Sequence, residues 1–338
     1  MYYNVESISL KSKYETKEVK EFLEKFNLKY EDVDYTVVIR ENDDIIATCS
    51  KKENILKCFA INENYQGLGL SNNLISKVTE QLFLEGRYHS FIFTKPENQF
   101  LFEGLGYKNI VTTDKVSLLE SGNKNINSSL DTLKKQYNID DNKEYAALVM
   151  NCNPFTLGHR YIVETAAKEN ENVIIFVVEE DKSVFPFSTR FRLIKEGTKD
   201  LENVTVMPAG EYVISSATFP NYFLKKNDDA LKEYTKLDCN IFGKYFAPKF
   251  NIVRRYVGTE PHCEVTNTYN ESMKEVLPKY NVEVKLIERK QIEDDAISAS
   301  RVRRLLKEGK LEKVKNLLPT HSFEFLLSEE GEKVINEL

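Results

Sequence analysis

Apolar positions recur with two different periods in the first third of this 338-residue chain. From Val19 to Phe26 they fall at i, i+3, i+4 and i+7, which predicts an amphipathic helix over residues 17–26. A longer amphipathic helix is predicted over residues 70–84. Short apolar runs predict strands at residues 35–40, 45–50, 55–61 and 89–94. Residues 1–120 are therefore expected to form a mixed α/β domain.

The second part of the chain alternates strands with helices more regularly. Residues 173–178 are continuously apolar, as is typical of a parallel strand covered on both faces. Strands are predicted at residues 145–150, 173–178, 204–207, 238–241, 252–257 and 282–287. Helices are predicted at residues 159–168, 190–198, 267–277 and 300–307. This alternation predicts a doubly wound, Rossmann-like parallel sheet over residues 144–338, with ligands at the carboxyl ends of its strands.

A polar segment rich in Asn and Ser separates the two parts. It spans residues 121–143 and contains one short helical pattern near residues 130–137. Such composition between two periodic regions is typical of a linker. We therefore expect two domains joined at this segment.

Composition excludes several classes of function. The net charge of −6 and the pI near 5.6 argue against nucleic acid as the main partner, because binding to phosphate backbones needs a basic face. No apolar run reaches the 18 residues of a membrane span, and the first residues lack the pattern of a signal peptide. The five cysteines form no CxxC pair, and only four histidines exist. We expect a cytoplasmic protein with reduced thiols and no metal site built from its own side chains.

The first segment with chemical meaning spans residues 153–159, Asn-Pro-Phe-Thr-Leu-Gly-His, between a predicted strand and a predicted helix. Gly158 lacks a Cβ where a phosphate group would approach the backbone, and Thr156 adds a hydroxyl. His159 stands where a helix presents its N–H groups and dipole to an anion, and it can donate to phosphate oxygens. The alternative is an ordinary strand–turn–helix junction that is capped by Thr156, with an exposed histidine.

A second segment, residues 297–303, reads Ile-Ser-Ala-Ser-Arg-Val-Arg. Ser298 is a suitable N-cap, and Ser300 then falls in the first helical turn. Arg303 lies about one turn further on, where its side chain leans back toward the helix start and can bind phosphate oxygens in pairs. The alternative is a capped surface helix with a basic face.

Together, the two segments resemble the signature motifs of the nucleotidylyltransferase superfamily. Thr156-x-Gly158-His159 is similar to its (H/T)xGH motif, and residues 297–303 are similar to its ISSTxxR motif, with Ser300 in place of the usual threonine. In that superfamily the Gly and the His of the first motif contact the nucleoside triphosphate, and no covalent enzyme intermediate forms. The resemblance therefore implies ATP as a substrate, with Mg²⁺.

Further segments narrow the resemblance to the citrate lyase synthetase family, also called [citrate (pro-3S)-lyase] ligases. They are residues 179–187, 211–220 and 256–261, taken with residues 153–156. The resemblance implies an ATP site, and cations near the triphosphate would offset its charge. The implied catalytic residues are His159, Ser300 and Arg303. The implied ATP-binding residues are Asn153, Phe155, Thr156, Gly158, His159, Lys182, Arg190, Gly258, Glu260, Ser298, Ser300 and Arg303.

The first domain carries a resemblance of its own. Residues 64–70, Asn-Tyr-Gln-Gly-Leu-Gly-Leu, resemble the acyl-CoA-binding loop of GNAT-type N-acetyltransferases, with Asn64 where Gln or Arg is usual. Gly67 and Gly69 would let backbone N–H groups bind the pyrophosphate of a pantetheine-bearing substrate at a helix start. An ordinary glycine-rich turn before a helix remains the alternative.

The combined resemblance implies an ATP-dependent acetate:thiol ligase. Such an enzyme acetylates the CoA-like prosthetic group of the citrate lyase acyl-carrier (gamma) subunit through acetyl-adenylate, and it releases AMP and pyrophosphate. Three alternatives stay open at this point. The chain could be a nucleotidylyltransferase that makes a dinucleotide-like cofactor, a GNAT N-acetyltransferase with an ATP-sensing domain, or a non-catalytic adaptor for an acyl-carrier protein.

Overall fold

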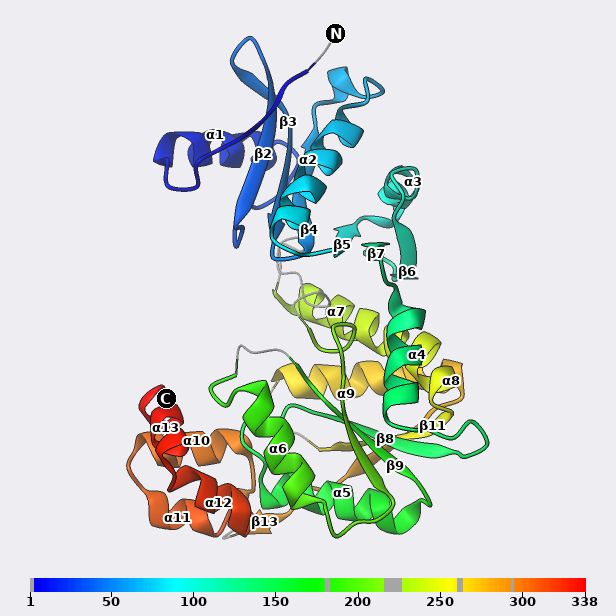
Figure 1. Cartoon of the computed structure of the whole chain (residues 1–338), viewed down its shortest axis with the longest axis vertical. Coiled ribbons are helices and arrows are strands. Elements are labelled where there is room, and N and C mark those ends of the chain that lie inside the picture. Colours follow the sequence, from blue (N-terminus) through cyan, green and yellow to red (C-terminus); the bar gives the residue numbers. More distant parts are fainter. Residues whose placement is uncertain (1–2, 180–182, 216–226, 260–263, 293–294) are drawn as a thin grey trace. The chain divides into compact units, whose positions relative to one another are not determined.

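The computed structural model describes residues 3–179, 183–215, 227–259, 264–292 and 295–338 (Figure 1). The chain forms two compact units, Met1–Ile126 with Pro220–Leu237, and Asn127–Phe219 with Asp238–Leu338. The first change of unit falls inside the predicted linker, where helix α4 (Ile126–Gln136) extends beyond the short helical piece expected there. The return of a later segment to the first unit, described from Asn227 onward, was not predicted from the sequence. In the described part of the chain, no helix is both long enough and apolar enough to cross a membrane.

In the first unit, the described strands form a mixed seven-stranded sheet in the order β1-β2-β3-β4-β5-β7-β6. The strands are β1 (Val5–Ser7), β2 (Tyr35–Glu41), β3 (Asp44–Lys52), β4 (Ile55–Ile61), β5 (His89–Thr94), β6 (Lys108–Thr112) and β7 (Ser117–Gly122). The helices are α1 (Lys13–Glu24), α2 (Leu70–Leu84) and the short α3 (Gln99–Glu103). The bounds of β4, α2 and β5 agree with the predictions, whereas β1, α3, β6 and β7 were not predicted as elements.

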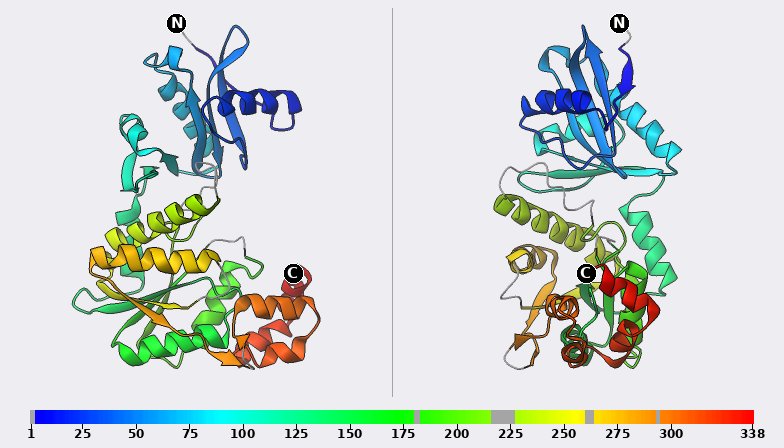
Figure 2. Two further views of the ribbon diagram at one scale, coloured as in Figure 1. Left: turned by 180° about the vertical axis from the view of Figure 1, so that it is seen from behind. Right: turned by 90° about the vertical axis from the view of Figure 1, so that its left-hand side faces the viewer.

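Helices α1 and α2 cover opposite faces of this sheet (Figures 1 and 2). Successive side chains of a strand point to opposite faces, so Val37 and Ile39 pack in the core that contains α2, while Val38 packs in the core that contains α1. The continuous apolar run in β2 therefore reflects a strand that is buried on both sides. Strand β4 pairs with β5 only at Ile55 and Leu56, and the glycine-containing segment follows β4.

In the second unit, five described strands form a parallel sheet in the order β10-β9-β8-β11-β12. The strands are β8 (Tyr145–Met150), β9 (Val173–Val177), β10 (Val204–Pro208), β11 (Ile252–Gly258) and β12 (Glu283–Ile287). The helices of this unit include α5 (Leu157–Glu169), α6 (Phe187–Gly197), α8 (Ala247–Lys249) and α9 (Glu264–Val276). Helix α7 (Asn227–Ile241) belongs to the first unit up to Leu237 and to the second unit from Asp238. Helices α5 and α9 lie on opposite faces of the sheet, as a doubly wound fold requires (Figures 1 and 2). The expected fold class is confirmed.

One predicted strand of the second unit is wrong. Residues 238–241 belong to α7, which continues into a π-helical segment, Phe242–Phe246. The buried side chains Tyr234, Leu237 and Ile241 are spaced by three and four residues, which is the period of a helix. A four-residue window was too short to show this period.

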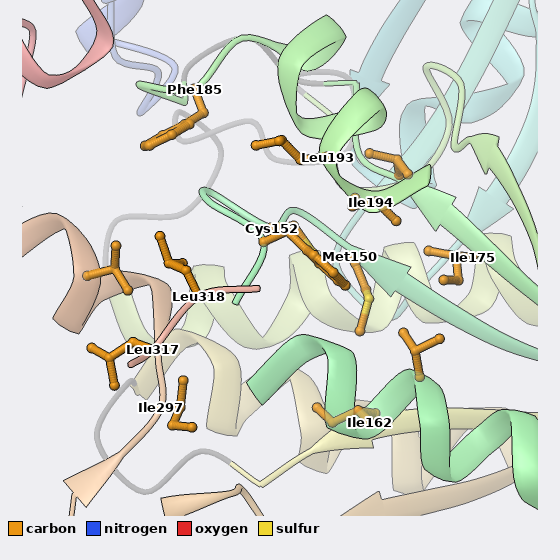
Figure 3. Packing of buried hydrophobic residues seen from close by; sticks show 14 of the residues in the cluster. Met150, Cys152, Ile162, Ile175, Phe185, Leu193, Ile194, Ile297, Leu317 and Leu318 are labelled. Atoms are coloured by element: carbon orange, nitrogen blue, oxygen red, sulfur yellow. The ribbon is translucent and has the colours of Figure 1, made fainter. Parts of the chain in front are cut away.

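The C-terminal part of the chain packs into the hydrophobic core of the second unit. After the short hairpin of β13 (Gln291–Ile292) and β14 (Asp295–Ala296) come α10 (Ala299–Lys307), α11 (Leu311–Lys315), α12 (Thr320–Leu326) and α13 (Glu329–Asn336). Figure 3 shows the converging side chains, with Met150 and Cys152 from β8 and the loop after it, Ile162 from α5, and Ile297, Leu317 and Leu318 from the C-terminal part. This packing brings the second predicted motif onto the first.

Candidate nucleotide-binding active site

The first motif lies at the topological switch point of the parallel sheet. The chain leaves β8 toward β9 and β10 on one side, and later crosses back to β11 and β12 on the other side. In open α/β sheets, ligands bind outside the carboxyl ends of the strands at such a point. Residues 153–159 follow β8 directly and run into α5.

Thr156 and His159 form a reciprocal cap at the start of α5. The Thr156 hydroxyl accepts the backbone N–H of His159 at 3.3 Å, and His159 Nδ1 accepts the backbone N–H of Thr156 at 3.1 Å. Because an N–H group can only donate, Nδ1 carries no proton, and in the neutral ring the proton is on Nε2. Burial, together with the positive charge of Arg289, lowers the pKa of His159 to about 4. At neutral pH the side chain is therefore an uncharged donor through Nε2.

The second motif caps α10 and contacts the first motif directly. The Ser298 hydroxyl accepts the backbone N–H of Arg301 at 3.1 Å, as expected of an N-cap. Arg303 donates through one terminal nitrogen to the carbonyl oxygen of Asn153, and its other terminal nitrogen lies 3.4 Å from the exposed Ser300 hydroxyl. The structure thus brings Ser300 and Arg303 of the second motif to Asn153 of the first motif, which is far away in the sequence.

The structure shows a different reason for glycine at position 158 from the one expected. A Cβ built at Gly158 would lie 2.5 Å from the carbonyl oxygen of Ile297, the residue that opens the second motif. The glycine therefore permits the close approach of the second motif's backbone. Two N–H groups of the first turn of α5 are already used, because Leu157 donates to the Leu317 carbonyl at 2.9 Å and His159 donates to Thr156. The expected anion site at this helix start is correspondingly smaller.

Arg190 is placed differently from the expected phosphate contact. Its side chain is fully buried, with 0% exposure, and it donates to the carbonyl oxygens of Phe185, Asn151 and Val178 at 2.9, 3.0 and 2.7 Å. Those carbonyls follow β8 and β9, so Arg190 fastens the loops that border the site. Asn153 adds to this frame, because its side-chain oxygen accepts the N–H of Phe185 at 3.1 Å.

Phe155 and Gly258 also serve packing. Phe155 is fully buried, and its ring stacks on His159 with centroids 6.1 Å apart. A Cβ at Gly258 would lie 2.8 Å from Cδ1 of Ile162, so this glycine lets the end of β11 approach α5. Lys182 and Glu260 lie outside the described residues, and their predicted contacts with ATP stay predictions.

Both glycines of the loop before α2 have a left-handed backbone conformation. Gly67 and Gly69 have φ of +79° and +78°, a conformation that other residues rarely adopt, and Gly69 precedes the first turn of α2. No heavy atom lies within 4 Å of a Cβ built at either position. The loop therefore needs glycine for its conformation and leaves open space above its backbone.

Sequence comparisons identify the family of this chain. A family model described as the citrate lyase ligase C-terminal domain matches residues 145–326. The chain is 35% identical over 324 residues to a [citrate [pro-3S]-lyase] ligase of Klebsiella pneumoniae, and the match covers 94% of each chain. A ligase of the same name from Escherichia coli (strain K12) is 35% identical over 316 residues, which is 91% of this chain and 89% of the relative. This chain belongs to the citrate lyase ligase family.

Solved structures similar to parts of this family member include proteins of two kinds. An acetyltransferase of the GNAT family from Staphylococcus aureus Mu50 covers 36% of this chain and 100% of its own, with 14% identity and a TM-score of 0.30. A candidate nicotinate-nucleotide adenylyltransferase from Vibrio parahaemolyticus covers 58% of this chain and 97% of its own, with 19% identity and a TM-score of 0.35. Family membership rests on the sequence matches.

Arg289 lies near the site of this family member but was not predicted as a site residue from the sequence. It follows β12, outside both motifs, and its Nε donates to the carbonyl oxygen of Thr259 at 2.6 Å. No recognised motif includes this position. The one signal in the sequence was its place just after a predicted parallel strand, where ligand-binding residues gather.

Replacing Arg190 with glutamine is expected to lower stability more than ATP affinity. Buried carbonyl oxygens would lose their donors, which typically costs about 1–3 kcal/mol in the free energy of unfolding. Arg192→Gln is the matched control, because Arg192 lies on the same helix with a half-exposed side chain paired to Glu330. Chemical denaturation and ATP titration of both variants measure the two effects. A large loss of ATP affinity at unchanged stability would instead show direct contact.

Proposed function

We propose that this protein is an ATP-dependent ligase that activates acetate as acetyl-adenylate and transfers the acetyl group to a thiol. The proposed acceptor is the CoA-like prosthetic group of the citrate lyase acyl-carrier (gamma) subunit. The structural observation that carries the adenylation step is the contact between Arg303 and the Asn153 carbonyl, which joins the two motifs at the switch point. Family membership supports the choice of acid and acceptor.

In the first step, an acetate oxygen forms a bond to the α-phosphorus of ATP, and the bond to the β-phosphate oxygen breaks. Negative charge grows on the departing pyrophosphate. The His159 Nε2–H, the Ser300 hydroxyl and the Arg303 guanidinium are the donors proposed to stabilise that charge. Because the pKa of His159 is lowered to about 4, this donor is neutral over the physiological pH range. Thr156 and Ser298 hold the two helix starts in place.

In the second step, the sulfur of the thiol attacks the carbonyl carbon of acetyl-adenylate. A thioester forms, AMP leaves with the electron pair of the broken C–O bond, and the thiol proton is released. The described histidines near the site do not suggest a base, because His159 Nδ1 is bonded to Thr156 and His321 Nε2 lies 3.0 Å from the Leu193 carbonyl oxygen. The relatives are named as ligases, which agrees with this class of reaction.

Magnesium is proposed to enter with ATP. Among the described residues, no group of three or more His, Cys, Asp or Glu side chains is arranged to hold a metal ion. Mg²⁺ is commonly bound by substrate phosphates and water with few protein ligands. We therefore propose the phosphate oxygens of ATP as its main ligands. The residues of the chain are assigned only to binding and orienting the phosphates.

The first unit is proposed to bind the phosphopantetheine arm of the acceptor through the loop with Gly67 and Gly69. Gly67→Val is expected to impair use of the thiol substrate and to spare the exchange of pyrophosphate into ATP. The matched control is Gly86→Val, because Gly86 has a φ of +73° and equally open surroundings near the other end of α2. Thioester formation and exchange are measured for both. Equal loss of both activities in Gly67→Val alone would contradict this division of labour.

The adenylation step is tested by isotope exchange between labelled pyrophosphate and ATP. Exchange that requires acetate and needs no thiol supports the proposal. Exchange that requires a nucleotide or phosphopantetheine instead would favour a nucleotidylyltransferase that makes a dinucleotide-like cofactor. Consumption of acetyl-CoA without ATP would favour an N-acetyltransferase.

A further inference from the structure

Arg289 lies across the carboxyl end of β11, next to α5. Its Nε is bonded to the carbonyl oxygen of Thr259, the first residue after that strand. A Cβ built at Gly258 would lie 3.9 Å from both Cγ and Nε of Arg289, and 2.8 Å from Cδ1 of Ile162. The side chains of Arg289 and of Ile162 on α5 therefore both lie next to the position that a side chain at residue 258 would take.

This position is close to the donor histidine of the first motif. Ile162 follows His159 by three residues on α5, so the two side chains share one face of the helix. The positive charge of Arg289 acts on His159 and, after burial, is the second cause that lowers its pKa. Geometry and electrostatics thus both place Arg289 beside the first turn of α5.

Two arginines from different parts of the chain consequently lie near the first motif. Arg303 reaches the Asn153 carbonyl from α10, and Arg289 reaches the end of β11 from the segment after β12. Because the imidazole of His159 is neutral, the guanidinium of Arg289 supplies the positive charge that an anionic ligand needs there. Arginine also has the planar donor geometry that fits phosphate oxygens.

We propose that Arg289 binds the phosphate chain of the nucleotide at the carboxyl end of β11, in addition to Arg303. The inference rests on the proposed function, because it needs ATP in the site at the switch point. In this proposal Arg289 contacts the substrate directly, and its hydrogen bond to the Thr259 carbonyl holds the guanidinium in position. The competing explanation is purely structural, with Arg289 only fixing the end of β11.

The test compares ligands with and without phosphates. Calorimetric titration measures the affinities of adenosine, AMP and ATP for the wild type, Arg289→Gln, Arg289→Lys and the control Arg254→Gln. Arg254 lies on β11, and its side chain pairs with Glu283 and Asn170. We expect Arg289→Gln to weaken ATP binding about tenfold or more and to leave adenosine binding within about twofold. Arg289→Lys should bind ATP with intermediate affinity, and the control should match the wild type.

The outcomes separate this inference from the proposed function. Equal weakening of adenosine and ATP binding, or unchanged ATP binding in Arg289→Gln, would overturn the contact with phosphate while the nucleotide site stands. A wild type that binds neither ATP nor adenosine would overturn the proposed function, and the role of Arg289 with it.

An NMR titration of the four histidines gives a second readout that is independent of ligand. The signal of His159 is assigned with the His159→Asn variant. The pKa of His159 should rise in Arg289→Gln, because a nearby positive charge is removed, and it should stay unchanged in Arg289→Lys and Arg254→Gln. An unchanged pKa in Arg289→Gln would show that the guanidinium does not lie beside His159.

Discussion

Replacing His159 with asparagine is expected to lower kcat for AMP formation by about 10²–10³-fold while the protein stays folded. Asparagine keeps an oxygen close to the position of Nδ1, so the backbone N–H of Thr156 retains its acceptor. The variant lacks the donor at Nε2, which is the group proposed to stabilise charge on the departing pyrophosphate. Single-turnover measurement of AMP formation, together with a thermal unfolding curve, separates catalysis from stability.

The matched variant is His159→Gln, whose amide can place an N–H near the position of Nε2 while it gives up the cap. We expect part of the activity to return and the stability to fall below that of His159→Asn. Since the pKa of His159 lies near 4, the activity of the wild type should show no titration of this residue between about pH 6 and 9. Normal turnover in His159→Asn would show that His159 is not a catalytic residue.

The second large effect is expected for Gly158→Ala, which places a methyl group against the backbone of the second motif. The added Cβ would lie 2.5 Å from the Ile297 carbonyl oxygen, so the backbone of one motif must move. Overpacking of this kind typically costs about 1–3 kcal/mol in the free energy of unfolding. Misplacement of catalytic groups by about 1 Å can cost about 10²-fold in rate. Denaturant unfolding and kcat/KM for ATP measure the two losses.

Gly258→Ala gives the comparison for this effect. Its Cβ would meet the terminal methyl group of the Ile162 side chain, which can rotate away, whereas the Ile297 carbonyl is held in the backbone. We therefore expect smaller losses of stability and of kcat/KM in Gly258→Ala than in Gly158→Ala. Equal activity of Gly158→Ala and the wild type would show that the contact between the motifs is not needed for the reaction.

The local chemistry of the two motifs was predictable from the sequence. Ser298 caps its helix as expected, and Thr156 forms the cap that the alternative interpretation of the first motif gave it. A hydroxyl before a helical pattern satisfies free N–H groups whatever the tertiary context. The alternation of strands and helices predicted the parallel sheet, and with it the position of residues 153–159 at a strand end. Periodicity and capping are short-range properties, and they could be read directly.

Long-range packing was not predictable in the same way. Gly158 was expected to make room for phosphate, but the backbone at Ile297 occupies that approach. Arg190 was expected at the triphosphate, but its side chain is buried and donates to three carbonyl oxygens of the two loops after β8 and β9. Arg289 belongs to no recognised motif. Its place beside His159 depends on the order of the strands in the sheet, which the local sequence does not show. Charge and residue type alone do not distinguish a ligand-binding arginine from one that fastens loops.

The most direct test of the central claim is AMP release from ATP and Mg²⁺, with and without acetate, in the presence of the citrate lyase carrier subunit or a dephospho-CoA-like thiol. The account predicts that AMP appears only with acetate, together with an equal amount of acetyl thioester. AMP release that is independent of acetate, or an adenylylated product in place of the thioester, would contradict it.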